Sequence, residues 1–145
     1  WMQVMRVNTL GPFICAKAVA PHMKAQQWGR IINVASTSAL KGLSNMAHYV
    51  TSKGAVITFT RVLARELGAW HITANALAPG LTLSDQILKN DEHMAKFGEV
   101  IRKSRSIQRD ALPADLVGTV SFLASDDAAF MTGQTLTLDG GFLIS

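Results

Sequence analysis

The sequence is poor in cysteine and in charged residues, and both shortages narrow the class of protein. A single cysteine, Cys15, stands among 145 residues, so no disulfide can form within the chain. Charged residues make up 17% and hydrophobic residues 48%, which excludes a disordered chain. No apolar run reaches the ~18–20 residues that a membrane-spanning helix needs, and the first residues show no signal-peptide pattern. We therefore expect one soluble globular domain in a reducing compartment, the cytoplasm.

A concentrated basic surface is also missing, although the chain carries a formal charge of +4 from 14 basic and 10 acidic residues. The densest basic group consists of Arg102, Lys103 and Arg105, and no aromatic residue lies among them. Proteins that bind nucleic acids gather cations on one face and add aromatic side chains that stack on bases. The scattered charge favours a solvated basic surface. Binding to nucleic acid stays an alternative, and a steep fall of affinity with salt would support it.

Metal-ligand spacing is absent as well. The four histidines do not recur at short intervals, and one cysteine is too few for a thiolate site. We expect no bound metal ion.

The segments that are present alternate between helix and strand. Apolar residues at helical spacing predict helices at residues 3–24, 47–68 and 113–123, and short β-branched runs predict strands at 31–35, 72–77 and 134–138. Residues 28–30 are expected to form a turn and residues 36–46 a loop. Strands separated by helices are typical of a parallel sheet. The predicted fold is α/β, with a doubly wound parallel sheet.

The strand ends suggest where a ligand would bind. In open parallel sheets, ligands lie beyond the carboxyl ends of the strands. Ser36 follows the first predicted strand, and Pro79-Gly80 ends the second. The long polar segment 81–109 comes next, and its length favours a functional flap over a simple connection.

Tyr49, the only tyrosine, precedes Lys53 by four residues on a predicted helix, so both side chains share one face. An ammonium group close to a phenol favours the phenolate, which lowers the phenol pKa from about 10. Tyr49 is then a candidate acid-base group. Ser36, 13 residues earlier, could donate a hydrogen bond to the oxygen atom that Tyr49 protonates. The alternative is an exposed tyrosine beside a solvated lysine.

Several further segments occur together with this pair, in an order that resembles the short-chain dehydrogenase/reductase family. They cover nearly the whole chain: VNTLG at 7–11, GRIINVAS at 29–36, YVTSK at 49–53, NALAPG at 75–80, LASD at 123–126, TGQ at 132–134 and DGG at 139–141.

The resemblance implies an oxidoreductase that uses NAD or NADP to interconvert a ketone and a secondary alcohol. Tyr49 would be the acid-base residue, and Lys53 would hold the nicotinamide ribose and tune Tyr49. Ser36 would polarise the substrate carbonyl, and Asn8 would fix a water in a proton relay. The group of 3-oxoacyl-thioester reductases is the most similar. Apolar residues of the flap, such as Leu81 and Leu83, favour a partly apolar substrate.

The resemblance also places Pro79 and Gly80 against the nicotinamide. In the family pattern an Ile or Val and a Thr follow this glycine at two and four positions, whereas this sequence has Thr82 and Ser84. Thr82 would use its backbone. Ser84 keeps a hydroxyl group for the carboxamide or the phosphates.

The family's opening strand, its glycine-rich pyrophosphate turn and its Asn-Ala-Gly segment are not found in this sequence. Residues 1–145 are therefore expected to form a partial Rossmann-like domain, the carboxyl-terminal part of a longer enzyme. The first strand would have an unpaired edge. The isolated chain is expected to bind dinucleotide weakly and not to turn over.

The resemblance further implies a homodimer or tetramer, with the helices near residues 4–24 and 49–68 at the interface. Apolar residues on more than one face of these helices favour the same conclusion. A truncated, non-catalytic chain that acts only in oligomer assembly remains the alternative.

Overall fold

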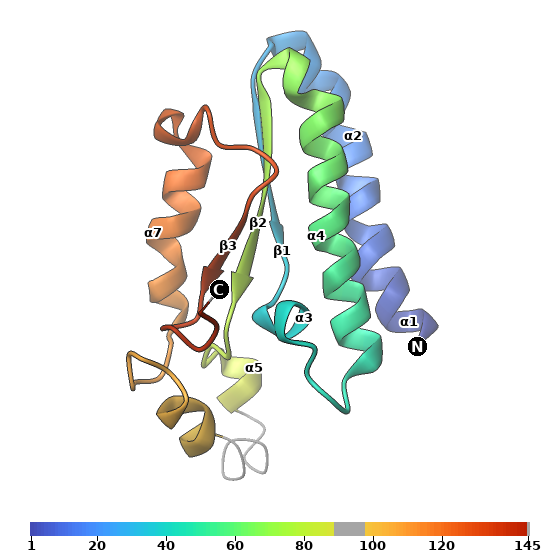
Figure 1. Ribbon diagram of the computed structural model, residues 1–145. Coiled ribbons are helices and arrows are strands. Elements are labelled where there is room, and N and C mark those ends of the chain that lie inside the picture. The colour runs from blue at the N-terminus through green and yellow to red at the C-terminus, as the bar shows by residue number, and fades with distance from the viewer. Residues whose placement is uncertain (89–97, 145) are drawn as a thin grey trace.

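Three parallel strands form the centre of the chain in the computed structural model, which describes residues 1–88 and 98–144 (Figure 1). They are β1 (Gly29–Val34), β2 (Ile72–Pro79) and β3 (Thr135–Leu138), in the order β1-β2-β3. Ile31 lies opposite Ala74, and Leu77 opposite Leu136. The parallel α/β sheet is therefore confirmed. Within the described residues β1 pairs only with β2, so its outer edge is open, as expected.

The helical arm that precedes β1 changes its hydrogen-bond pattern partway along. It consists of α1 (Met2–Met5), the π-helical segment η1 (Arg6–Leu10) and α2 (Gly11–Gln26). The N–H of Gly11 donates to the carbonyl of Arg6, five residues back. Pro12 follows at the start of α2, where its missing N–H is tolerated. The π-helical widening lies directly before Pro12, and such widenings are frequent at functional sites.

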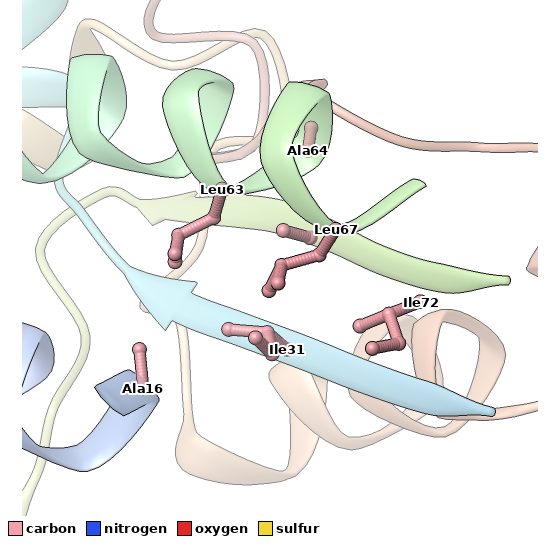
Figure 2. Close-up of a cluster of buried hydrophobic side chains, with 7 residues drawn as sticks. Ala16, Ile31, Leu63, Ala64, Leu67 and Ile72 are labelled. Atoms are coloured by element: carbon pink, nitrogen blue, oxygen red, sulfur yellow. The ribbon is translucent and has the colours of Figure 1, made fainter. Parts of the chain in front are cut away.

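A long helix, α4 (Ala47–Leu67), packs on β2 and supplies much of the core. Figure 2 shows Leu63 and Leu67 of α4 pointing toward Ile31 of β1, and Ala64, Ile72 and Ala16 belong to the same buried cluster. Seven of the eight residues of β2 are buried, because α4 and α7 (Pro113–Ala124) both contact this strand. The central strand thus has no solvent-facing side.

Two predictions about the segments around β1 were wrong. Gly29 and Arg30 belong to β1 rather than to a turn, and they pair with Ile72 and Thr73. Residues 36–46 are not a continuous loop, because they contain the short helix α3 (Thr37–Lys41). Serine at a helix start accepts a hydrogen bond from the first turn, and Ser36 does so here.

The remaining elements are short. The 3-10 turns η2 (Gly68–Trp70) and η3 (Asp126–Ala128) follow α4 and α7. Within the predicted flap the structure places α5 (Asp85–Leu88) and a helical segment at 98–103, and the rest of the flap, 89–97, lies outside the described residues. None of the helices in the described part of the chain is long and apolar enough to cross a membrane.

A buried arginine holds the corner that follows β2. Arg105 is only 4% exposed, and its guanidinium donates hydrogen bonds to the carbonyl oxygens of Leu81 and, at 2.9 Å, Arg109. The sequence had grouped Arg105 with Arg102 and Lys103 as part of a solvated surface, which was wrong for Arg105. The packing of the chain around Gly80 encloses this side chain, and sequence spacing could not show that.

The start of α7 is fixed by Asp115, whose carboxylate accepts hydrogen bonds from the guanidinium of Arg109 at 2.7 Å and from the N–H of Leu112 at 2.7 Å. The hydrogen bond from Arg109 is the main cause that holds the pKa of Asp115 far below its usual value. Asp115 therefore connects the carboxyl end of the flap to α7.

We expect replacement of Arg105 by Met to lower the free energy of unfolding by roughly 2–4 kcal/mol, since the carbonyls of Leu81 and Arg109 both lose a hydrogen bond from a charged donor. Lys103→Met, which removes an exposed cation two residues away, should change it by less than about 0.5 kcal/mol. Urea titration of both variants measures the difference. Equal effects would contradict the role given to Arg105.

The stabilisation that Asp115 contributes should depend on pH. Because the folded pKa is depressed, the contribution is complete above the unfolded carboxyl pKa of about 3.9 and is lost as pH falls toward the folded value. Asp115→Asn should therefore be less stable than wild type at pH 7 and converge with it in acid. Asp127→Asn, which removes an exposed carboxylate with no ion pair in the described residues, should keep a constant difference. Unfolding curves from neutral pH to about pH 3 would decide.

Candidate active site

The carboxyl ends of the three strands meet at one edge of the sheet, and hydrogen bonds join the segments that leave them. The Thr37 hydroxyl, directly after Ser36, donates to the carbonyl oxygen of Pro79 at 3.3 Å. The N–H of Gly80 donates to the carbonyl oxygen of Leu138 at 3.1 Å. This edge therefore gathers the residues that follow β1, β2 and β3, as parallel strands require.

Ser36 lies at this edge as the N-terminal cap of α3. Its backbone is extended, with φ −165° and ψ 146°, which turns the side chain back over the first helical turn. The Ser36 Oγ accepts hydrogen bonds from the N–H of Ser38 at 3.2 Å and from the Ser38 hydroxyl at 2.8 Å. The hydroxyl group is thus held in one place by its own helix.

Tyr49 and Lys53 occupy the first two turns of α4, at the end of this helix that lies beside α3 (Figure 1). The Lys53 Nζ donates to the carbonyl oxygen of Val34, the last residue of β1, at 2.9 Å, and lies 5.8 Å from the centre of the Tyr49 ring. Burial lowers the pKa of Lys53 from its usual value. The ammonium therefore connects the phenol-bearing turn of α4 to the strand end that leads into Ser36.

Asn8 reaches the same turn of α4 from the π-helical segment η1. Its side-chain amide donates to the Ser52 hydroxyl at 3.0 Å, and Ser52 donates to the Tyr49 carbonyl oxygen at 2.7 Å. Ser52 is fully buried. Asn8 thus contacts the backbone of the Tyr49 turn through one intermediate side chain.

Ser52 is a residue to which the sequence analysis assigned no role. It directly precedes Lys53 within the YVTSK segment, and the available signal was its spacing of three residues from Tyr49. At that spacing a helical serine can bond to a carbonyl of the preceding turn. Only the packing of η1 against α4 shows that it also receives Asn8.

The four residues expected at the nicotinamide lie at the end of β2 and directly after it. Gly80 has no room for a side chain, because a Cβ there would lie 2.8 Å from the Cβ of Asp139. The Thr82 hydroxyl donates to the Gly80 carbonyl oxygen at 3.1 Å, and the Ser84 hydroxyl accepts from the N–H of Ile87 at 3.4 Å. Pro79 is linked to the segment that contains Ser36 by the hydrogen bond from the Thr37 hydroxyl. Thr82 and Ser84 show no direct hydrogen bond to Tyr49, Lys53 or Ser36 within the described residues.

Asp139 is the first residue after β3. Its carboxylate accepts hydrogen bonds from three backbone N–H groups, those of Gly141 at 3.0 Å, Phe142 at 3.2 Å and Leu143 at 2.9 Å. The chain bends at residues 139–141, where both glycines have positive φ, and the aspartate carboxylate holds that bend. No group of three or more metal-ligating side chains occurs in the part of the chain that the structure describes.

The arrangement can supply two hydrogen-bond donors of different acidity and a nearby cation. A phenol and a hydroxyl are both able to donate a hydrogen bond to an oxygen atom of a ligand, and an ammonium stabilises negative charge that develops close to it. This set is suited to proton transfer at a carbonyl or alcohol oxygen.

Comparison with known proteins gives matches over almost the whole chain. A family model described as Enoyl-(Acyl carrier protein) reductase matches residues 1–143. The chain is 38% identical over 146 residues to a 3-oxoacyl-[acyl-carrier-protein] reductase of Synechocystis, and 39% identical over 142 residues to one of Staphylococcus epidermidis. These matches cover 99% and 97% of this chain but 56% and 57% of the relatives. The chain thus spans a little over half the length of the curated relatives it matches.

Solved structures agree with this. A gluconate 5-dehydrogenase from Burkholderia cenocepacia in complex with NADP and tartrate superposes with a TM-score of 0.92 at 36% identity, over 98% of this chain and 55% of that one. A 3-oxoacyl (acyl-carrier-protein) reductase from Agrobacterium tumefaciens with NADP bound gives a TM-score of 0.85 at 29% identity, over 93% and 53%. Sequence motifs, fold and relatives agree, and the chain belongs to the short-chain dehydrogenase/reductase family.

Proposed function

We propose that this chain carries the proton-transfer and carbonyl-binding residues of an NAD(P)H-linked ketone reductase. The observation that carries the proposal is the position of the Lys53 ammonium, 2.9 Å from the carbonyl at the end of β1 and 5.8 Å from the Tyr49 ring. This position puts a cation between the phenol and the segment that contains Ser36. We also propose that residues 1–145 are one part of a larger Rossmann-like domain.

The donor set after β2 is chemically suited to the nicotinamide end of the cofactor. Thr82 and Ser84 supply hydroxyl groups, and Gly80 brings the backbone close to the strand ends. Lys53 of α4 adds an ammonium with three N–H donors, one of which bonds to the Val34 carbonyl. Ribose hydroxyls and a carboxamide are ligands for such donors. The sequence contains no glycine-rich pyrophosphate turn, so contacts to the phosphates are outside the proposal, as is the choice between NAD and NADP.

When bound, the reduced nicotinamide supplies a hydride to the carbonyl carbon of the ketone and becomes oxidised. The carbonyl oxygen takes the phenolic proton of Tyr49, so the product is a secondary alcohol. Ser36 donates a hydrogen bond to the same oxygen. The Lys53 ammonium stabilises the phenolate left on Tyr49 until a proton from water restores the phenol. Asn8, anchored through Ser52, is proposed to hold a water that delivers this proton.

The proposed substrate class is a 3-oxoacyl thioester. Several relatives are named 3-oxoacyl-[acyl-carrier-protein] reductase, and the segment after β2 carries half-buried Leu81, Leu83 and Ile87. Apolar side chains at this edge are compatible with an acyl chain. The proposed location is the cytoplasm, where Cys15 would stay reduced.

A homo-oligomer is proposed on a separate observation. The helices η1, α2 and α4 expose large apolar side chains to solvent, and we name this set the helical surface: Val7, Leu10, Phe13, Ile14, Val19 and Val62. A groove of about 300 Å³ lies beside the helical surface and is lined by residues of η1, α2 and α4. Among them are Phe13 and Phe59, whose ring centroids are 6.2 Å apart. Exposed apolar patches of this kind mark interfaces, and we propose a second copy of the chain as the occupant.

The catalytic proposal is tested with Tyr49→Phe, made in the protein expressed with any sequence that precedes Trp1 in its reading frame. Loss of the phenolic proton should lower kcat for reduction of an acetoacetyl thioester by about 10²–10⁴-fold. Consumption of NADPH or NADH is followed by absorbance. His48→Ala changes the exposed neighbour and should stay within several-fold of wild type. A Tyr49→Phe enzyme as fast as wild type would contradict the proposal.

The oligomer proposal is tested with Phe13→Glu, which places a charge in the apolar groove. Sedimentation velocity should show a dimer or tetramer for the wild type and a shift to monomer for the variant, because burying an unpaired carboxylate is unfavourable. Val100→Glu puts the same charge on an exposed apolar residue away from the helical surface and should leave assembly intact. A wild-type monomer, or an unchanged Phe13→Glu oligomer, would refute the interface.

A further inference from the structure

Ser38 is a buried polar residue near the candidate site to which the proposed function gives no role. It is 6% exposed and lies in the first turn of α3, two residues after Ser36. Its hydroxyl donates to the Ser36 Oγ at 2.8 Å, and this is the one hydrogen bond that the structure gives the Ser38 hydroxyl within the described residues. When the Ser38 hydroxyl donates to Ser36, its proton is used, and the proton of Ser36 is the one left to bind another group.

The hydrogen-bond capacity of Ser36 shows the consequence. A hydroxyl oxygen has two lone pairs and one proton. The N–H of Ser38 uses one lone pair at 3.2 Å, and the Ser38 hydroxyl uses the other at 2.8 Å. The Ser36 proton has no acceptor among the described residues other than the Ser38 oxygen. When Ser38 donates to Ser36, both lone pairs of Ser36 are used, and the Ser36 proton is left to donate to a ligand oxygen.

We propose that Ser38 is a positioning residue that makes Ser36 a dedicated hydrogen-bond donor to the substrate's carbonyl oxygen. The inference rests on the proposed function, because it assumes that a carbonyl oxygen binds at Ser36. The serine pair forms a chain of hydrogen bonds in which donation from Ser38 polarises Ser36 and strengthens its own donation. A donor that is already oriented needs little rearrangement as negative charge develops on the oxygen.

A purely structural role for Ser38 is the competing explanation. The backbone N–H of Ser38 already satisfies the cap of α3, and any residue at position 38 except proline provides that bond. The side-chain hydroxyl is an addition to the cap, and its partner is the oxygen atom of Ser36. Substitution of Ser38 by Ala therefore removes the second bond and keeps the first.

The test is a double-mutant cycle of Ser36→Ala and Ser38→Ala, in the protein expressed as for Tyr49→Phe. Ser38→Ala should lower kcat about tenfold, the effect of one hydrogen bond, with KM for the thioester changed less than about threefold because the donor acts mainly in the transition state. In the Ser36→Ala background, Ser38→Ala should have no further effect on kcat. Ser44→Ala, an exposed serine in the segment after α3, is the matched control and should resemble wild type.

Thermal unfolding of the same variants without cofactor separates positioning from stability. We expect the melting temperature of Ser38→Ala to stay close to that of wild type while kcat falls. If Ser38→Ala fails to fold, Ser38→Cys keeps the size of the side chain with a weak donor and should show the same loss of kcat.

The outcomes distinguish failure of the proposed function from failure of the inference about Ser38. A wild-type protein without reductase activity refutes the proposed function and the inference with it. An active wild type with an equally active Ser38→Ala refutes only the inference. So does an equal loss from Ser38→Ala in both backgrounds, since that result shows an effect independent of Ser36.

Discussion

The hydrogen bond from the Lys53 ammonium to the Val34 carbonyl is the contact on which the candidate site depends. It joins the second turn of α4 to the last residue of β1. A second side-chain hydrogen bond, from Asn33 of β1 to Thr60 at 2.9 Å, joins the same strand to α4 farther along the helix. An ammonium group reaches this carbonyl because α4 lies along the sheet with its N-terminal end at the carboxyl edge. The half-burial that lowers the Lys53 pKa also strengthens the field that the cation exerts on nearby groups.

Rigid supports surround this contact on both sides. On one side Asn8 and Ser52 fix the backbone of the Tyr49 turn. On the other, Thr37 bonds to the end of β2, and Arg105 holds the carbonyl of Leu81 just beyond it. The side chains proposed for chemistry are thus held by residues whose own hydrogen bonds are internal to the protein. Such support is what a proton-transfer site needs, because small displacements of donors weaken their effect on the transition state.

The sheet order explains how one chain can hold a site and still span only part of its relatives' length. β2 is central and buried, with β1 and β3 beside it, so the carboxyl ends of these three strands lie side by side. The outer edge of β1 is unpaired within the described residues. A parallel strand with one open edge is a natural place for a further strand to pair. The residues proposed for proton transfer all belong to this chain, and a further strand would pair with the outer edge of β1.

The sequence by itself determined the alternation of helices and strands, the parallel sheet, the position of Ser36 just beyond a strand end, and the placement of Tyr49 and Lys53 on neighbouring turns of one helix. These features follow from periodicity and from the rule that parallel strands end at one edge, and both are local or topological. The tertiary structure alone decided the burial of Arg105, the link from Asn8 through Ser52, the helix at Thr37–Lys41 and the bond between Ser38 and Ser36. Burial and side-chain pairing depend on which distant segments pack together, and no short stretch of sequence carries that information.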